Sequence, residues 1–137
     1  MRILIVLLFL GFSINKTFAQ DTLHFKTKPI VKDASYSGGG MEDLYYYVNN
    51  NFNYNNVKKT DIPQTSKKQS YFIFYVVFAI SEDGKAFEFS PKEIKEDNSF
   101  YKEAVRVIAS VRWNPSLVGN EYKKQFLVLP IKASVNE

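Results

Sequence analysis

Two stretches of the chain carry apolar residues at helical spacing. The first predicts a helix over residues 41–52, because its apolar side chains recur every three or four positions. Glu42 and Asp43 stand in its first turn, where acidic groups favour the positive end of the helix dipole. An asparagine-rich stretch then ends the helix. The apolar positions are Met41, Leu44, Val48 and Phe52.

The second helical stretch is expected to begin at Ser99, whose hydroxyl can cap the helix, and to end near Val111. Three of its polar residues, Lys102, Glu103 and Arg106, are expected to face water. The apolar positions are Phe100, Ala104, Val107, Ile108 and Val111.

Residues 71–80 are a run of apolar and aromatic residues that predicts a central strand, since it is rich in β-branched and aromatic side chains. Asp83 and Gly84 follow it and form a turn of the kind that joins antiparallel strands, because glycine accepts positive φ at little cost. A second strand is expected over residues 85–90. One face of the first strand is wholly apolar and is expected to meet the helices: Phe72, Phe74, Val76, Phe78 and Ile80.

Residues 122–132 predict a last strand with alternating side chains. Pro130 lies within it. Because proline has no N–H to donate, it is tolerated in an edge strand and poorly in a central one. We therefore expect this strand at the rim of the sheet.

Together these elements predict an α+β fold, in which a small antiparallel sheet of about three strands packs against two helices. The sheet would consist of the central hairpin and the C-terminal edge strand. Residues 20–37 show no sustained period and are expected to form an extended lead-in. Residues 38–137 are expected to form the single folded domain.

The first 19 residues have the pattern of a secretory signal. Arg2 precedes an apolar run over residues 3–14, and Thr17-Phe18-Ala19 forms a small-residue cleavage site before Gln20. The run is shorter than the roughly 20 apolar residues that a transmembrane helix needs. The chain is therefore predicted to be exported, to the periplasm or beyond the cell, as a mature form that does not span the membrane.

Composition removes several classes of function. The chain has no cysteine and one histidine, His24, so thiolate chemistry and histidine-based catalytic or metal sites cannot be assembled. Two of its 18 basic residues belong to the predicted signal, and the remaining near-neutral charge does not suit nucleic-acid binding. Glu93, Glu96 and Asp97 are interpreted as a solvated acidic loop rather than an acid–base pair. We expect no enzymatic activity, no cofactor and no metal.

The order of these motifs resembles the C-terminal domain of the TonB family, a periplasmic module that contacts outer-membrane transporters. The resemblance extends over residues 36–133 and depends on the order and spacing of the motifs together. The matching text is Gly38-Gly39-Gly40, residues 41–54, residues 77–80, Asp83-Gly84-Lys85, residues 103–108, Trp113-Asn114-Pro115, Gly119 and Leu129-Pro130-Ile131.

The resemblance implies a binding function without catalysis. Family members capture a short extended peptide of a transporter beside an exposed strand, where backbone hydrogen bonds supply affinity. Asp83 and Gly84 would form the hairpin turn, Trp113 would anchor the core, Pro115 would terminate the second helix and Gly119 would permit a turn. The partner-binding residues would be Gln125, Phe126, Leu127, Val128, Leu129, Pro130 and Ile131.

Departures from the family pattern leave two alternatives open. TonB-type energy transducers have an N-terminal transmembrane helix and a long proline-rich spacer before the binding domain. Here the apolar run is short, and the lead-in contains only one proline, Pro29. An anchored transducer for outer-membrane transport is the first alternative. A structural homodimer in the cell envelope is the second, although Lys123 and Lys124 also fit the protection of an open edge against self-association.

Overall fold

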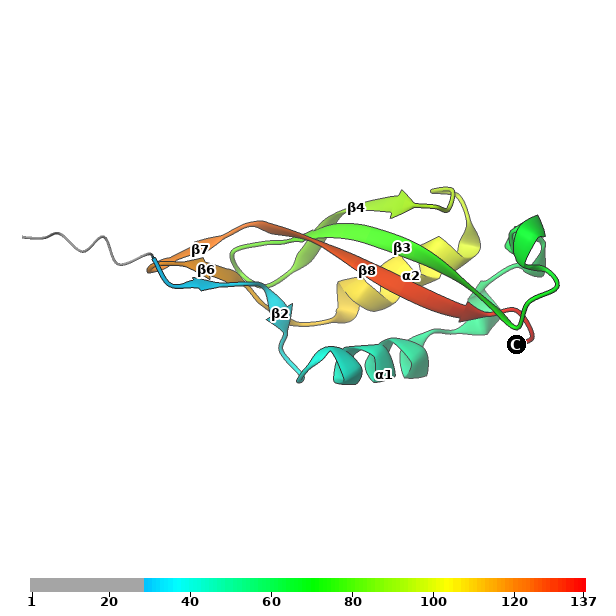
Figure 1. Ribbon diagram of the computed structural model, residues 1–137, viewed down its shortest axis with the longest axis horizontal. Helices are drawn as coiled ribbons and strands as arrows, with labels where there is room; N and C mark the ends of the chain where they lie inside the picture. Colours follow the sequence, from blue (N-terminus) through cyan, green and yellow to red (C-terminus); the bar gives the residue numbers. More distant parts are fainter. Residues whose placement is uncertain (1–28) are drawn as a thin grey trace, which may run out of the picture.

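The computed structural model describes residues 29–137 of the chain (Figure 1). The predicted signal, residues 1–19, and His24 lie outside the described residues. Within residues 29–137, neither helix is long and apolar enough to cross a membrane.

The main sheet has three antiparallel strands in the order β4-β3-β8. They are β3 (Tyr71–Ile80), β4 (Ala86–Lys92) and β8 (Gln125–Ser134). With two helices beside this sheet, the predicted α+β fold is confirmed (Figure 1). The strand order also confirms that the C-terminal strand lies at a rim, since β3 is its only strand neighbour among the described residues.

The two helices are α1 (Met41–Asn51) and α2 (Ser99–Ser110). Asp43 caps the start of α1, because its carboxylate accepts a hydrogen bond from the Gly40 N–H at 2.9 Å. The cap of α2 is Asn98, whose side chain accepts from the Phe100 N–H at 2.9 Å. The predicted cap at Ser99 was therefore wrong by one residue: the Ser99 hydroxyl instead accepts from the Lys58 N–H.

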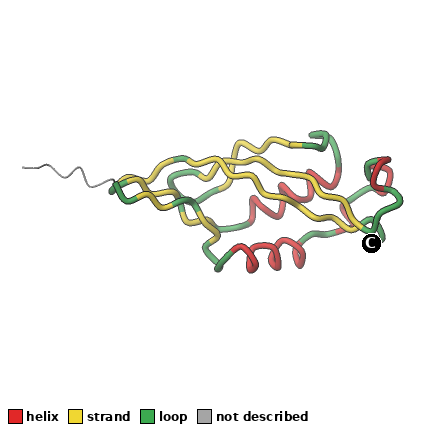
Figure 2. Tube along the Cα trace, viewed as in Figure 1, coloured by secondary structure: helices red, strands yellow, loops and turns green. Residues whose placement is uncertain are grey.

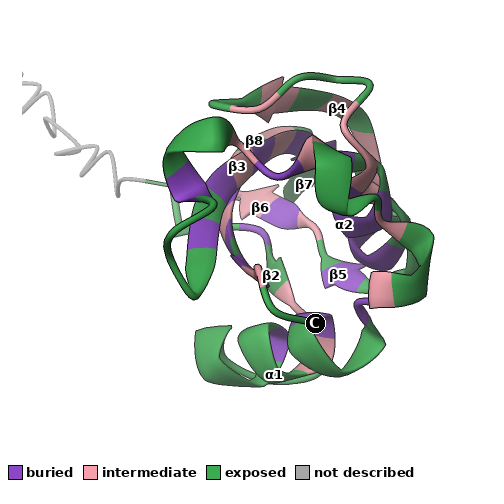
Figure 3. Cartoon of the chain, turned by 90° about the vertical axis from the view of Figure 1, so that its right-hand side faces the viewer, coloured by how far each residue is buried: buried purple, intermediate pink, exposed green. Residues whose placement is uncertain are grey.

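The hydrophobic core lies between the helices and one face of the main sheet (Figure 3). Side chains alternate along β3, so that every second residue points into the core. The apolar stripes of α1 and α2 close the core from the other side. Its largest fully buried side chains are Phe74, Phe78, Phe100, Leu44, Ile80, Ile108, Val76 and Val107.

Two smaller sheets tie the chain before α1 to the segment after α2 (Figure 2). In the first, β1 (Val31–Lys32) pairs with β6 (Ser116–Val118), which also pairs with β7 (Glu121–Lys123). In the second, β2 (Ser35–Tyr36) pairs with β5 (Trp113–Asn114). Residues 31–36 of the predicted lead-in thus belong to the folded unit. The predicted continuous strand over 122–132 was also wrong, because it is divided at Lys124 into β7 and β8.

The connection between α1 and β3 contains three short 3-10 helices, Tyr54–Asn56, Lys59–Asp61 and Gln64–Ser66. Ile62 is buried in the core, and Tyr54 and Val57 pack against it, so apolar side chains hold this connection to the domain. Asp61 adds a polar tie, since its carboxylate accepts from the Ser99 N–H at the start of α2.

Candidate functional site

The outer edge of β8 is the first element of the candidate site. All ten residues of β8 pair with β3 without a register shift. Beyond its end, the Val135 N–H donates to the Ser70 carbonyl oxygen, whereas the Ser134 N–H donates to the Tyr54 hydroxyl at 2.9 Å. Because successive backbone groups of a strand point to opposite sides, the groups of every second residue point away from β3. These residues are Phe126, Val128, Pro130 and Lys132.

Pro130 has a place in this row that its chemistry explains. It faces Tyr75 of β3, and its backbone belongs to the outward set, so the missing N–H removes no hydrogen bond to β3. Within residues 29–137, no hydrogen bond reaches the outward N–H groups of Phe126, Val128 or Lys132. The edge therefore offers a row of free backbone donors and acceptors.

An apolar hollow of about 440 Å³ lies beside the middle of this edge. The segment before α1 and the first turn of α1 form one wall, and β8 forms the other. Trp113 and Phe78 contribute to its lining. The other lining residues are Ala34, Ser35, Tyr36, Gly39, Gly40, Met41, Leu44, Leu127, Val128 and Leu129.

A second hollow, of about 360 Å³, lies further along the same edge. Tyr45, Val48 and Asn49 of α1 stand on one side, and residues 130–132 of β8 stand on the other. The two hollows lie one after the other along β8, beside residues 127–129 and residues 130–132. An extended chain laid along the outer edge of β8 would therefore pass both. Side chains on one face of that chain would then meet α1.

The structure divides the seven predicted partner-binding residues into two groups. Leu129 and Ile131 are buried in the core, and Leu127 packs against it. The Gln125 side chain is engaged, because its Oε1 accepts from the Ala34 N–H at 2.6 Å. The second group, Phe126, Val128 and Pro130, presents backbone groups outward, and the first two side chains are more than half exposed.

The five residues predicted to have structural roles lie near one end of the sheet. Trp113 is buried in the core and contacts Phe78, at 5.2 Å between ring centroids. Gly84 and Gly119 both have positive φ. Gly84 also stands so close to Trp113 that a Cβ there would collide with the Trp113 carbonyl oxygen. Asp83 lies in the hairpin turn.

Pro115 lies between β5 and β6, and its predicted role was wrong in detail. The helix before it ends at Ser110, with Val111 as its C-cap. Pro115 therefore follows a paired strand and does not itself stop the helix. Sequence reasoning placed the end of the helix correctly near Val111.

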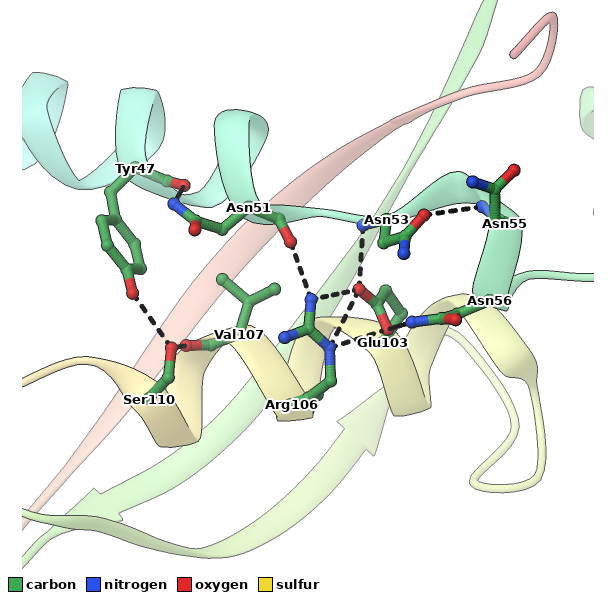
Figure 4. A network of polar contacts seen from close by, with 9 residues as sticks. All are labelled: Tyr47, Asn51, Asn53, Asn55, Asn56, Glu103, Arg106, Val107 and Ser110. Atoms are coloured by element: carbon green, nitrogen blue, oxygen red, sulfur yellow. Dashed lines mark hydrogen bonds and ion pairs between the residues drawn. The ribbon is translucent and has the colours of Figure 1, made fainter.

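A buried carboxylate that the sequence pattern missed fixes α1 against α2 (Figure 4). Glu103 is 3% exposed, so the prediction that it faces water was wrong. Its oxygens accept from the Asn53 N–H at 2.8 Å and from Asn56 Nδ2 at 2.9 Å. Arg106 pairs with Glu103 at 2.5 Å and also donates to the Asn51 carbonyl oxygen at the end of α1. This network fixes the position of α1, which forms one side of both hollows.

These contacts determine the charge state of Glu103. Burial by itself would raise the pKa of this carboxyl, but the hydrogen bonds from Arg106, Asn56 and Asn53 outweigh it and lower the pKa below 4.5. Glu103 is therefore an anion at neutral pH, with its charge matched by donors. The contacts of Glu103 and Arg106 join α2 to the end of α1 and to the segment that follows it, which indicates a structural role.

The acidic residues considered for catalysis lie elsewhere. Glu93 and Asp97 line a cleft of about 710 Å³ beside residues 60–64. Asp61 of the same cleft is engaged with Ser99. Across residues 29–137 there is no group of three or more acidic, histidine or cysteine side chains that could hold a metal ion.

Comparison with known proteins assigns no family: no protein-family model matches the chain, and no curated protein matches it.

Proposed function

We propose that this chain is an exported, non-catalytic binding module that captures an extended segment of a partner protein in the cell envelope. The guest segment adds to the outer edge of β8 as a fourth strand of the main sheet. The observation that carries the proposal is the row of free backbone groups from Phe126 to Lys132 of β8, which lacks only the N–H of Pro130 and lies beside two apolar hollows.

The opposite rim of the sheet is less suited to such a guest. β4 has a register shift against β3 between Val77 and Ala79. Glu88, within β4, has a φ of 52°, which turns the backbone out of the regular strand geometry. Irregularities of this kind are a common protection of sheet edges, so the two rims differ in a way that favours β8.

Backbone pairing and the hollows supply different parts of the interaction. Each hydrogen bond of an added strand contributes about 0.5–1.5 kcal/mol net, and these bonds carry little sequence information. Selectivity comes from the alternate side chains of the guest that face the hollows. This division fits a partner of the kind that the TonB-like motifs imply, the N-terminal segment of an outer-membrane transporter.

A second copy of this chain is a poorer guest. If two β8 edges paired antiparallel with Val128 facing its own copy, Pro130 would face Phe126 and could donate no hydrogen bond. Lys132 would face Lys124 in the same register, and like charges directly opposite one another destabilise a strand pair. In this register the repulsion between Lys124 and Lys132 disfavours self-association, which a guest of different sequence avoids.

Peptide binding by a Val128→Pro variant tests the proposal. The substitution removes one outward N–H and leaves the β3 ladder intact, and Pro130 already shows that β8 accepts proline on this side. Fluorescence anisotropy with labelled transporter N-terminal peptides should show binding to the native chain and to Val128→Thr. Binding to Val128→Pro should fall at least tenfold. Equal affinity of all three forms would overturn strand addition.

A further inference from the structure

The face of the main sheet that points away from the helices is uncovered. Residues of β3 that alternate with the core positions point to this face, and Ile73 is 48% exposed. Phe126 and Val128 of β8 add side chains that are 55% and 53% exposed. We call this surface the open face. Its apolar residues are Tyr71, Ile73, Tyr75, Val77, Phe87, Phe126, Val128 and Pro130.

Three lysines lie over the aromatic rings of the open face. Lys132 Nζ is 4.1 Å from the Tyr71 ring centroid, and Lys92 Nζ is 5.5 Å from that of Tyr75. Lys124 lies between two rings, 4.9 Å from Phe126 and 5.1 Å from Phe87. In such pairs the methylene stem covers apolar surface while the ammonium group stays in water.

The charge on the open face is unbalanced. Lys124 is paired with Glu88, at 2.7 Å. Neither Lys92 nor Lys132 has an ion-pair partner among the described residues. Lys92 belongs to β4 and Lys132 to β8, the two outer strands, so the two lysines flank the apolar centre of the open face at opposite edges of the sheet.

We propose that the open face docks on the surface of a lipid bilayer that carries anionic headgroups. The lysines would move off their rings to meet phosphate groups, and the uncovered tyrosine, phenylalanine and aliphatic side chains would lie at the boundary of headgroups and acyl chains. Tyrosine suits this boundary, because its ring is apolar and its hydroxyl is polar. Anionic surface potential attracts lysines placed in this way.

Other occupants fit the open face less well. A second copy laid face to face would bring Lys92 and Lys132 against lysines of the same sign. The side chains of Ile73, Phe126 and Val128 protrude from the sheet, which suits insertion into a soft, fluid boundary.

Docking of the open face is compatible with capture of a guest strand. The free backbone groups of β8 point sideways, in the plane of the sheet, whereas the open face points out of that plane. A chain resting on a bilayer would therefore keep its β8 edge accessible. The two proposals share residues of β8, but strand capture depends on their backbone groups and bilayer docking on side chains of the open face, so the two can fail separately.

Vesicle flotation tests bilayer docking on the chain purified after periplasmic expression. It should bind vesicles containing phosphatidylglycerol, bind vesicles of phosphatidylcholine alone far more weakly, and dissociate as salt is raised. The double variant Lys92→Gln/Lys132→Gln should lose about 30-fold in affinity for the anionic vesicles. Ile73→Ser should also weaken binding, which separates apolar insertion from charge.

The matched control is Lys67→Gln/Lys68→Gln, which removes the same charge from two exposed lysines in the loop before β3. It should bind almost like the native chain. An equal loss in both double variants would overturn the proposal, because net charge alone would then explain binding. Absence of binding to anionic vesicles at low salt would overturn it as well.

Discussion

The backbone N–H of Trp113 donates a hydrogen bond to the carbonyl oxygen of Gly84 at 3.1 Å. This bond ties the tip of the β3–β4 hairpin to β5, beside the hollow that Trp113 lines. Gly84 has a φ of 81°, a conformation that residues with a Cβ rarely adopt. The packing of the buried Trp113 against the hairpin therefore depends on glycine at position 84 of the turn.

Gly84→Ala should therefore destabilise the domain by about 2 kcal/mol or more, through left-handed strain and collision with the Trp113 carbonyl. Urea unfolding followed by tryptophan fluorescence measures the change. Gly119→Ala is the matched control, since Gly119 also has positive φ but a Cβ there would meet only Pro29, at 4.0 Å. Its cost should be about 1 kcal/mol, and equal losses would contradict the proposed close approach.

Removal of the Glu103 carboxylate should loosen α1 from α2. Glu103→Ala leaves the Asn53 N–H and Asn56 without their acceptor, so the free energy of unfolding should fall by about 2 kcal/mol. Arg106→Ala should cost about 1 kcal/mol or less, because half of that side chain is exposed and Glu103 keeps two donors. Chemical denaturation measures both variants. A larger loss for Arg106→Ala would show that the ion pair, rather than the carboxylate, holds the helices.

The same carboxylate predicts a pH dependence of stability. Because the folded-state pKa of Glu103 lies below 4.5, its contribution is fully present above that pH and is lost as the pH falls through the folded pKa. Denaturation curves between pH 7 and pH 3 should show the native chain losing stability below about 4.5. Glu103→Gln should lose less over the same window, and a parallel loss in the two proteins would place the titrating group elsewhere.

Self-association should be weak in the native chain and stronger once Pro130 is replaced. Pro130→Val restores an outward N–H on the β8 edge, so two edges could form bonds that proline forbids. Sedimentation velocity at micromolar concentration should show a monomer for the native chain and added dimer for Pro130→Val. A native dimer that Val128→Pro weakens, or the absence of added dimer in Pro130→Val, would contradict the protective role assigned to this edge.

The features that could be predicted from the sequence are those that follow from the pattern of apolar residues or from the missing backbone N–H of a proline. Both helices came from repeating apolar positions, the strand at residues 71–80 came from a continuous run rich in β-branched and aromatic residues, and the rim position of β8 followed from the missing N–H of Pro130. The two-residue strands β1, β2 and β5 were not predicted, because so short a pairing has no period to detect. They form only because distant segments meet.

The sequence predicted the strand that forms the candidate site, but not which of its backbone groups and side chains are exposed. Alternation places Phe126 and Val128 on one face of β8, yet which backbone groups remain free depends on the pairing with β3. Glu103 was missed because its polar side chain sits beside other polar residues on α2. Its acceptor role depends on Asn53 and Asn56, about fifty positions earlier in the chain.

Amide hydrogen exchange along β8, measured by NMR with and without a bound transporter peptide, tests strand capture most directly. In the free protein, the amides of Leu127, Leu129 and Ile131 should exchange slowly, and those of Phe126, Val128 and Lys132 should exchange fast. Peptide binding should protect the second set while the first changes little. Saturating peptide that leaves Phe126, Val128 and Lys132 unprotected would contradict the account.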